Sequence, residues 1–142
     1  MNRLPLILVI EDNPADVQLL ELALSEAGIA ADLMTFADGA NAMRWIASCG
    51  DPNPSGPCPD LAIVDLNLPK YDGLELLNAL RRNSGLADVP ALVMSSSTSP
   101  RDEGRVRSLP NTEYLAKPSD LDAYAEVGAV IARLLARATH GG

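Results

Sequence analysis

Residues 4–14 read Leu4-Pro5-Leu-Ile-Leu-Val-Ile10-Glu11-Asp12-Asn13-Pro14. From Leu6 to Ile10 the chain is continuously apolar, which is typical of a strand buried on both faces of a parallel sheet. Asn13 can cap a helix, and Pro14 suits the first helical turn. The stretch therefore predicts a buried strand, then two acids at its carboxyl end, then a helix.

The same pattern recurs along the chain, with short runs rich in Val, Ile and Leu separated by stretches of helical periodicity. The predicted strands are Leu6–Ile10, Asp32–Phe36, Leu61–Asp65, Ala91–Ser95 and Glu113–Ala116. Such alternation is what a parallel sheet with helices on both faces requires. We therefore expect a doubly wound α/β domain with five strands and five helices.

The expected helices differ in how firmly their sequence anchors them. Four are predicted with clear apolar faces: from Pro14 until Gly28, from Asp38 to about Cys49, from near Asp72-Gly73, and from about Ser119 to Arg137, the last with Leu121 in its core face. The segment from Pro100 to Leu109 has only Val106 and Leu109 as sizeable apolar residues, so a helix there would be weakly anchored. Residues 50–59 hold four prolines and two glycines and predict an irregular connection.

Length and charge narrow the function classes. With 142 residues, 47% of them hydrophobic, the chain can bury one ordinary core, so we expect one domain over residues 1–142 with no output domain. A net charge of −8 disfavours nucleic acid as a partner. No apolar run is long enough for a membrane span or a signal peptide, and we expect a cytoplasmic protein.

Cys49 and Cys58 are the two cysteines, and no zinc-ligand set surrounds them. Two free thiols is the favoured interpretation, and a disulfide that closes the intervening loop is the alternative.

Unusual polar residues follow four of the predicted strands. Glu11-Asp12 come after the first, Asp65 ends the third, Ser95 ends the fourth, and Lys117-Pro118 come after the fifth. In open parallel sheets, ligands bind beyond the carboxyl ends of the strands. We therefore expect these side chains to meet in one pocket.

Three carboxylates in one pocket repel each other unless a cation neutralises them, and Mg²⁺ favours such oxygen ligands. We expect Asp12 and Asp65 as direct ligands, Glu11 acting through water, and the backbone carbonyl of Asn67 as a further ligand. A phosphoryl group on Asp65 would then need charge neutralisation from Lys117 and a hydrogen bond from the Ser95 hydroxyl.

Each residue also has a simpler interpretation on its own. Glu11-Asp12 are favourable acids near a helix N-terminus, and Asp65 is compatible with a strand-end cap. Lys117 is compatible with a solvated charge, and Ser95 with the start of a polar turn. These explanations must all hold at once at four strand ends, which favours the common site.

Four motifs together resemble the receiver domains of bacterial two-component response regulators, over essentially the whole chain. They are Val9-Ile-Glu-Asp-Asn13, the segment from Asp65 to Gly73, Val93-Met-Ser-Ser96, and Tyr114-Leu-Ala-Lys-Pro118. The resemblance implies a flavodoxin-like (βα)5 fold with strand order 2-1-3-4-5.

The same resemblance assigns roles. It implies that Asp65 is the phosphoacceptor, that Glu11 and Asp12 bind Mg²⁺, and that Lys117 contacts the phosphoryl group. Ser95 and Tyr114 would be the switch residues, which act on the surface around the fourth helix, the fifth strand and the fifth helix. Ser95-Ser96 stand where the family usually has threonine and then alanine.

A narrower resemblance links the chain to single-domain regulators paired with phytochrome-type histidine kinases. It is carried by Glu11-Asp-Asn-Pro-Ala-Asp16, the Pro-rich connection and Asp65-Leu-Asn-Leu-Pro69, while the stretch from Arg107 to Thr112 departs from the group. It implies a cognate histidine kinase, a homodimer, and a downstream protein or phosphotransfer partner.

Two other functions remain as alternatives to a switch domain that is not itself an enzyme. An aspartyl-phosphate-forming phosphatase usually has a second acid two residues after its nucleophile, where this chain has Asn67. A receiver-like scaffold without phosphorylation would not need the acidic and basic positions. A nucleotide-binding protein is disfavoured because no Gly-rich phosphate loop is present.

Overall fold

The computed structural model describes residues 4–49, 58–68, 70–83, 85–96 and 99–140. Strands and helices alternate along them in the order β1 Leu6–Ile10, α1 Pro14–Glu26, β2 Asp32–Phe36, α2 Gly39–Ser48, β3 Leu61–Asp65, α3 Gly73–Arg82, β4 Ala91–Ser95, α4 Pro100–Arg107, β5 Thr112–Ala116 and α5 Tyr124–His140. Most of the predicted irregular connection, residues 50–57, lies outside the described part of the chain.

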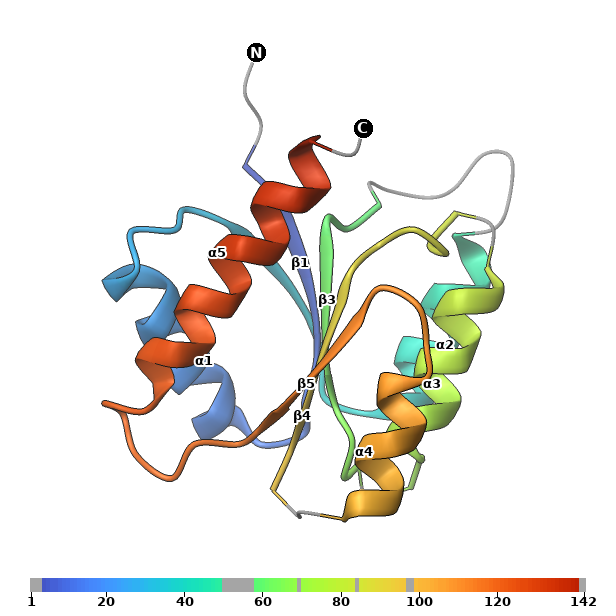
Figure 1. The fold of residues 1–142 in the computed structure, drawn as a ribbon. Helices are drawn as coiled ribbons and strands as arrows, with labels where there is room; N and C mark the ends of the chain where they lie inside the picture. Colours follow the sequence, from blue (N-terminus) through green and yellow to red (C-terminus); the bar gives the residue numbers. More distant parts are fainter. Residues whose placement is uncertain (1–3, 50–57, 69, 84, 97–98, 141–142) are drawn as a thin grey trace.

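All five strands are parallel and form one sheet in the order β2-β1-β3-β4-β5. The α/β fold and the strand order expected for a flavodoxin-like domain are confirmed. Helices α1 and α5 cover one face of the sheet, and α2, α3 and α4 cover the other (Figure 1). The order reverses between β1 and β3, which places the topological switch point beside their carboxyl ends.

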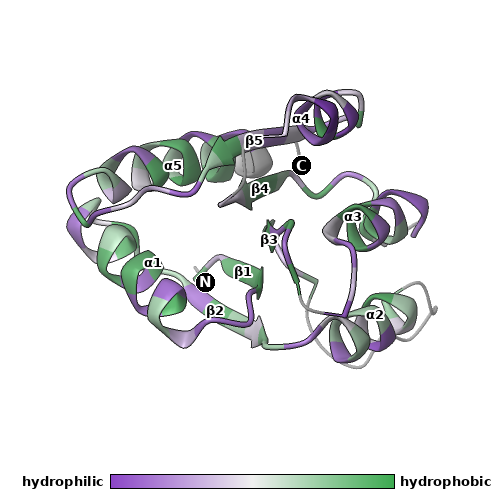
Figure 2. Cartoon of the chain, turned by 90° about the horizontal axis from the view of Figure 1, so that it is seen from below, coloured by the Kyte–Doolittle hydropathy of each residue, from purple (hydrophilic) through white to green (hydrophobic). Residues whose placement is uncertain are grey.

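Alternate residues of each central strand supply the two cores, because successive side chains point to opposite faces. In β1, Ile7 and Val9 pack with α1 and α5, whereas Leu8 and Ile10 pack with α2 and α3. The apolar faces of the helices point toward the sheet (Figure 2). This two-sided burial explains why the strand sequences read as apolar runs rather than as alternating patterns.

Helix α4 is held by few apolar contacts, as its sequence indicates. Val106 is its one buried residue, and Leu109 just beyond it packs against the same core cluster. Figure 2 shows α4 as mainly hydrophilic. The prediction of a weakly anchored helix is confirmed.

The predicted start of the last helix at Ser119 is wrong. Asp120 instead caps a turn, since its Oδ1 accepts a hydrogen bond from the Ala123 N–H at 2.8 Å. Backbone hydrogen bonds from each N–H to the carbonyl three residues earlier then lead into α5, which begins at Tyr124. As a result Leu121 is 42% exposed and does not belong to the core.

Cys49 is buried at the end of α2 and Cys58 is partly exposed, and both are free thiols. Within the described residues, no helix combines the length and apolar character needed to cross a bilayer.

Candidate functional site

The carboxyl ends of β1, β3 and β5 border an open cleft of about 530 Å³. Its wall is formed by Glu11, Asp12, Asn13, Asp16, Asp65, Asn67, Ser96, Lys117, Pro118 and Ser119. The predicted convergence of strand ends is therefore seen for β1, β3 and β5, whereas β4 reaches the cleft through Ser96 rather than through the predicted Ser95.

Asp65 lies at the base of this cleft as the last residue of β3 and is 4% exposed. Its Oδ1 accepts a hydrogen bond from the Asn67 backbone N–H at 2.9 Å, and its Oδ2 lies 3.2 Å from Lys117 Nζ. Burying a carboxylate costs free energy unless it has such partners. Both oxygens are thus oriented before any ligand arrives.

The loop after Asp65 is held in place by a close approach of α3 to β3. A Cβ on Gly73 would lie 2.7 Å from Leu66 Cα and 2.8 Å from the Asp65 carbonyl oxygen, so only glycine fits there. Asp72 caps α3 by accepting a hydrogen bond from the Leu74 N–H at 3.0 Å. The Asp72-Gly73 pair therefore fixes both the helix start and the loop that borders the cleft.

Three carboxylates form the acidic part of the site. One oxygen from each of Glu11, Asp12 and Asp65 lies within 4.8 Å of the other two. Glu11 is 9% exposed and its Oε2 accepts a hydrogen bond from the Asn13 N–H at 3.1 Å, whereas Asp12 is exposed to the cleft. An all-oxygen set at this spacing fits a hard divalent cation.

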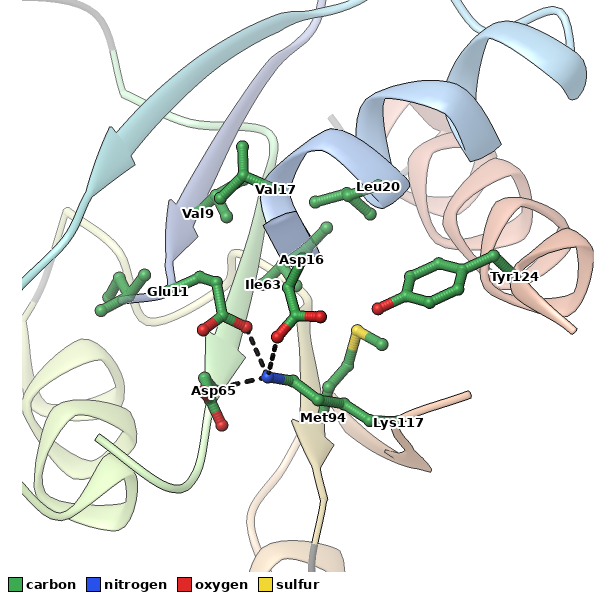
Figure 3. Close-up of a pocket in the computed structure, with 11 residues that line it drawn as sticks. Val9, Glu11, Asp16, Val17, Leu20, Ile63, Asp65, Met94, Lys117 and Tyr124 are labelled. Carbon is green, nitrogen blue, oxygen red and sulfur yellow. Dashed lines mark hydrogen bonds and ion pairs between the residues drawn. The ribbon is translucent and has the colours of Figure 1, made fainter. Parts of the chain in front are cut away.

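Lys117 contacts three carboxylates from the loop after β5 (Figure 3). Its Nζ lies 2.7 Å from Glu11 Oε1, 2.8 Å from Asp16 Oδ2 and 3.2 Å from Asp65 Oδ2. The Lys117 side chain is only 13% exposed. One ammonium group thus ties together α1 and the ends of β1 and β3.

Burial and ion pairing shift the pKa values of Glu11 and Lys117. Loss of water around Glu11 raises the pKa of that carboxyl to about 7, because the hydrogen bonds from Lys117 and Asn13 offset only part of the cost and Asp65 adds to it. Burial by itself lowers the pKa of Lys117, but its bonds to Asp16 and Glu11 outweigh this and raise it above its ordinary value. Lys117 is therefore a permanent cation at neutral pH.

Behind the carboxylates lies a small cavity of about 20 Å³ with largely apolar walls, which include Val9, Ile63, Met94 and Tyr124 (Figure 3). An apolar wall lowers the local dielectric and strengthens the ion pairs that lie against it.

Ser95 lies at the end of β4 and is 1% exposed. Its Oγ donates a hydrogen bond to Asn67 Oδ1 at 2.9 Å, and the Ser96 N–H donates to the same oxygen at 3.3 Å. The hydroxyl thus lies next to the loop that holds Asp65.

Tyr114 lies in β5 opposite Val93 of β4 and is 9% exposed. Its side chain belongs to the core cluster that includes Val106 of α4. The predicted switch residue therefore lies between the sheet and the weakly anchored helix.

The sequence interpretation missed two contacts. Asp16 had no assigned role, although it lies in the first turn of α1, beside the same strand ends. Asn67 was expected to contribute its backbone carbonyl, yet its side-chain oxygen and its N–H make the bonds that orient Ser95 and Asp65. Both contacts depend on side-chain direction, which residue spacing does not specify.

A sequence model of the response regulator receiver domain matches residues 7–127. The chain belongs to this family. The receiver is 35% identical over 115 residues to response regulator Rcp1 of Synechocystis sp., an alignment that covers 81% of this chain and 78% of Rcp1. The family resemblance seen in the sequence motifs is thereby confirmed.

Solved structures agree with this assignment. The receiver superposes on the phosphorylated cyanobacterial phytochrome response regulator RcpA with a TM-score of 0.80 and 29% identity, covering 94% of both chains. It superposes on the Mn²⁺-bound form of Rcp1 with a TM-score of 0.77 and 31% identity, covering 92% of this receiver and 94% of Rcp1. The chain is thus a response regulator receiver similar to phytochrome-associated regulators, which are signalling proteins rather than classical enzymes.

Proposed function

We propose that this receiver accepts a phosphoryl group on Asp65 from a histidine kinase and signals through a changed surface. The observation that carries the proposal is the Asp65 carboxylate itself. It lies at the base of an open cleft, with both oxygens oriented and two further carboxylates beside it. A nucleophilic carboxylate needs this positioning more than it needs covalent help.

The three-carboxylate group fits a Mg²⁺ ion held by Asp12 and Asp65, with Glu11 and the Asn67 backbone carbonyl as the remaining protein contributors. The bound ion would neutralise charge on the transferring phosphoryl oxygens. Rcp1, a similar regulator, has been solved in a Mn²⁺-bound form, which supports a divalent cation in this family site.

The chain's own groups then have separate tasks. An Asp65 carboxylate oxygen forms the new bond to phosphorus as the bond from phosphorus to the donor nitrogen breaks. Lys117 keeps its positive charge within reach of a phosphoryl oxygen, and the Ser95 hydroxyl can turn from Asn67 to donate to another. Asn67, which stands in place of an acid, supplies no proton to a leaving group. This favours storage of the phosphoryl group over phosphatase turnover.

Movement of Ser95 would be transmitted through Tyr114 to the surface formed by α4, β5 and α5. Tyr114 packs in the cluster that contains Val106, the one buried residue of α4. An element with so few buried contacts can change its position at low cost. We infer that this surface is the output of the switch and the contact surface of a homodimer.

The partners follow from the same proposal. Similarity to Rcp1 and RcpA favours a phytochrome-type histidine kinase in the cytoplasm as the phosphodonor. The output would pass to a downstream protein or phosphotransfer partner. Sedimentation of the unphosphorylated and phosphorylated receiver tests dimerisation, and identical profiles would count against it.

The central test is phosphorylation with Mg²⁺ and a small phosphodonor such as acetyl phosphate. The wild-type receiver should gain one acid-stable, base-labile phosphoryl group, and Asp65→Asn should gain none. Asp32→Asn, which removes an exposed acid at the opposite end of the sheet, is the matched control and should be labelled normally. Labelling that survives in Asp65→Asn would overturn the proposal.

A further inference from the structure

Asp16 differs from the other acids of the site. It contacts Lys117, but it is not one of the three clustered carboxylates, Glu11, Asp12 and Asp65, that could hold a metal ion. Its Oδ2 lies 2.8 Å from Lys117 Nζ, closer than the 3.2 Å from that nitrogen to Asp65 Oδ2. The group whose oxygens lie within 4.8 Å of one another consists of Glu11, Asp12 and Asp65. A cation in that group would therefore compete with Lys117 for Glu11 and Asp65, but not for Asp16.

The local backbone explains why Asp16 is available for this contact. It occupies the third position of α1, from which an acidic side chain commonly bonds back to the N–H of the capping residue. Here that N–H, on Asn13, is donated to Glu11 Oε2 at 3.1 Å. The Asp16 carboxylate instead turns toward the cleft, where Lys117 lies (Figure 3).

We propose that Asp16 is a positioning residue that holds the Lys117 ammonium group over Asp65 once a divalent cation engages Glu11 and Asp65. The inference rests on the proposed function, since a positioned Lys117 matters because it faces the incoming phosphoryl group. Lysine has a long, flexible side chain, and a neighbouring cation repels it. Without Asp16, the same repulsion would drive the ammonium group toward solvent.

The surroundings favour a strong Asp16–Lys117 pair. The two side chains are 23% and 13% exposed, and apolar residues of α1 together with Tyr124 lie beside them (Figure 3). Charge pairs that are this far removed from water are screened much less than pairs on the surface. The contact also joins α1 to the loop after β5, which lie 101 residues apart in sequence.

The first test uses the fact that Lys70 and Lys117 are the two lysines of the chain. In lysine-¹⁵N-labelled protein, the paired ammonium of Lys117 should give a slowly exchanging NMR signal, while the exposed Lys70 should not. In the wild type, the Lys117 signal should persist when Mg²⁺ is added. In Asp16→Asn, it should be present without Mg²⁺ and disappear with it. Persistence of the signal in Asp16→Asn with Mg²⁺ would overturn the proposal.

The second test is the rate of phosphorylation by acetyl phosphate at saturating Mg²⁺. Misplacing a group that faces the transition state can slow a reaction by up to roughly a hundredfold, and we expect Asp16→Asn to react at least roughly tenfold more slowly. Asp16→Glu keeps the charge and should recover part of the rate. Glu21→Gln removes an exposed acid from the same helix and should react as the wild type does. Equal rates for Asp16→Asn and Glu21→Gln would overturn the proposal.

Urea unfolding of the same variants separates positioning from stability. If Asp16 only stabilised the fold, Asp16→Asn would have a lower unfolding midpoint and an unchanged Lys117 signal.

The proposed function and the proposed role of Asp16 can be contradicted by different results. If the wild type is not phosphorylated, the proposed function fails, whereas the NMR experiment requires no phosphoryl transfer and still decides the role of Asp16.

Discussion

Ser95 Oγ donates a hydrogen bond to Asn67 Oδ1 at 2.9 Å and so links the end of β4 to the loop after Asp65. The Ser96 N–H donates to the same oxygen at 3.3 Å. In this conformation Asn67 is an acceptor for the hydroxyl that a phosphoryl oxygen would otherwise engage. In the proposed phosphorylated state the two acceptors would compete for one donor, and this competition would set part of the cost of switching.

Replacing Asn67 by alanine removes the competing acceptor. A neutral hydrogen bond contributes about 1 kcal/mol, so Asn67→Ala should bind the aspartyl-phosphate mimic beryllofluoride, with Mg²⁺, about fivefold more tightly than the wild type. Isothermal titration calorimetry measures this change directly. In a Ser95→Ala background the gain should vanish. An equal gain in both backgrounds would show that Asn67 acts by a route other than Ser95.

Gly73 lies where α3 approaches β3 closely. A Cβ at this position would lie 2.7 Å from Leu66 Cα, so Gly73→Ala must push the helix away from the strand that carries Asp65. Overpacking of this kind costs about 1–3 kcal/mol, and the urea midpoint should fall accordingly. Slower phosphorylation should accompany the loss, because the loop after Asp65 moves with the helix.

Gly104 in α4, unlike Gly73, has room for a larger side chain. A Cβ there meets nothing within 4 Å, and alanine favours a helix interior over glycine by about 1 kcal/mol. Gly104→Ala should therefore raise the urea midpoint. A fall in midpoint for this variant would contradict the open space seen around Gly104.

The sequence was sufficient for most of the fold. The predicted strands match the observed ones to within one residue. The central strands β1, β3 and β4 are apolar runs because they are buried on both faces, whereas the edge strands β2 and β5 keep polar residues such as Asp32 and Glu113. The start of α5 was missed because apolar periodicity continues through Leu121 while the backbone there forms an Asp120-capped turn. Turn bonds of this kind compete locally with a helix, and periodicity does not detect them.

For the site, the sequence predicted which residues gather but not every contact among them. Strand ends bring Glu11, Asp65 and Lys117 together by topology alone. The Asp16–Lys117 pair and the Asn67–Ser95 bond depend on side-chain directions that follow from caps and loops. The α1 cap and the close approach of Gly73 to β3 set these directions.

Arg81, in the last turn of α3, is half-buried and makes five hydrogen bonds. Its guanidinium joins the loops before β4 and before β5. The acceptors are the carbonyl oxygens of Ala87, Val89, Pro110 and Asn111 and the Oγ1 of Thr112. Burial lowers the pKa of Arg81, and the charge of Asp88 partly offsets this.

Arg81→Met should destabilise the receiver by on the order of 3 kcal/mol, because it strands several carbonyl acceptors in partly buried positions. Arg82 offers a matched control, since it is exposed and makes one bond, to the Asn78 carbonyl at 3.3 Å. Arg82→Met should change the unfolding free energy by less than about 0.5 kcal/mol. Urea denaturation monitored by circular dichroism compares the two. Equal effects would mean that the Arg81 bonds do not contribute to stability.

Glu113 of β5 and Arg133 of α5 form a two-bond ion pair across the proposed output surface. Arg133 Nη1 and Nη2 lie 2.6 and 2.9 Å from the two Glu113 carboxylate oxygens, and Arg137 lies 4.0 Å from one of them. The hydrogen bonds from Arg133 are the main reason that the pKa of Glu113 falls below its ordinary value of 4.5, with burial acting in the opposite direction.

This pair gives stability a defined pH dependence. Because the folded state lowers the pKa of Glu113, the contribution is fully present above the unfolded value of 4.5 and is lost as pH falls through the folded pKa. The difference in unfolding free energy between wild type and Glu113→Gln should therefore be constant near neutral pH and shrink below 4.5. Glu103→Gln, which breaks an exposed 3.5 Å pair with Arg107, should show a much smaller difference. Protonation of Glu113 removes the attraction to Arg133 in the wild type, which then resembles the variant. A difference in unfolding free energy between wild type and Glu113→Gln that grows on acidification would therefore contradict the ion pair.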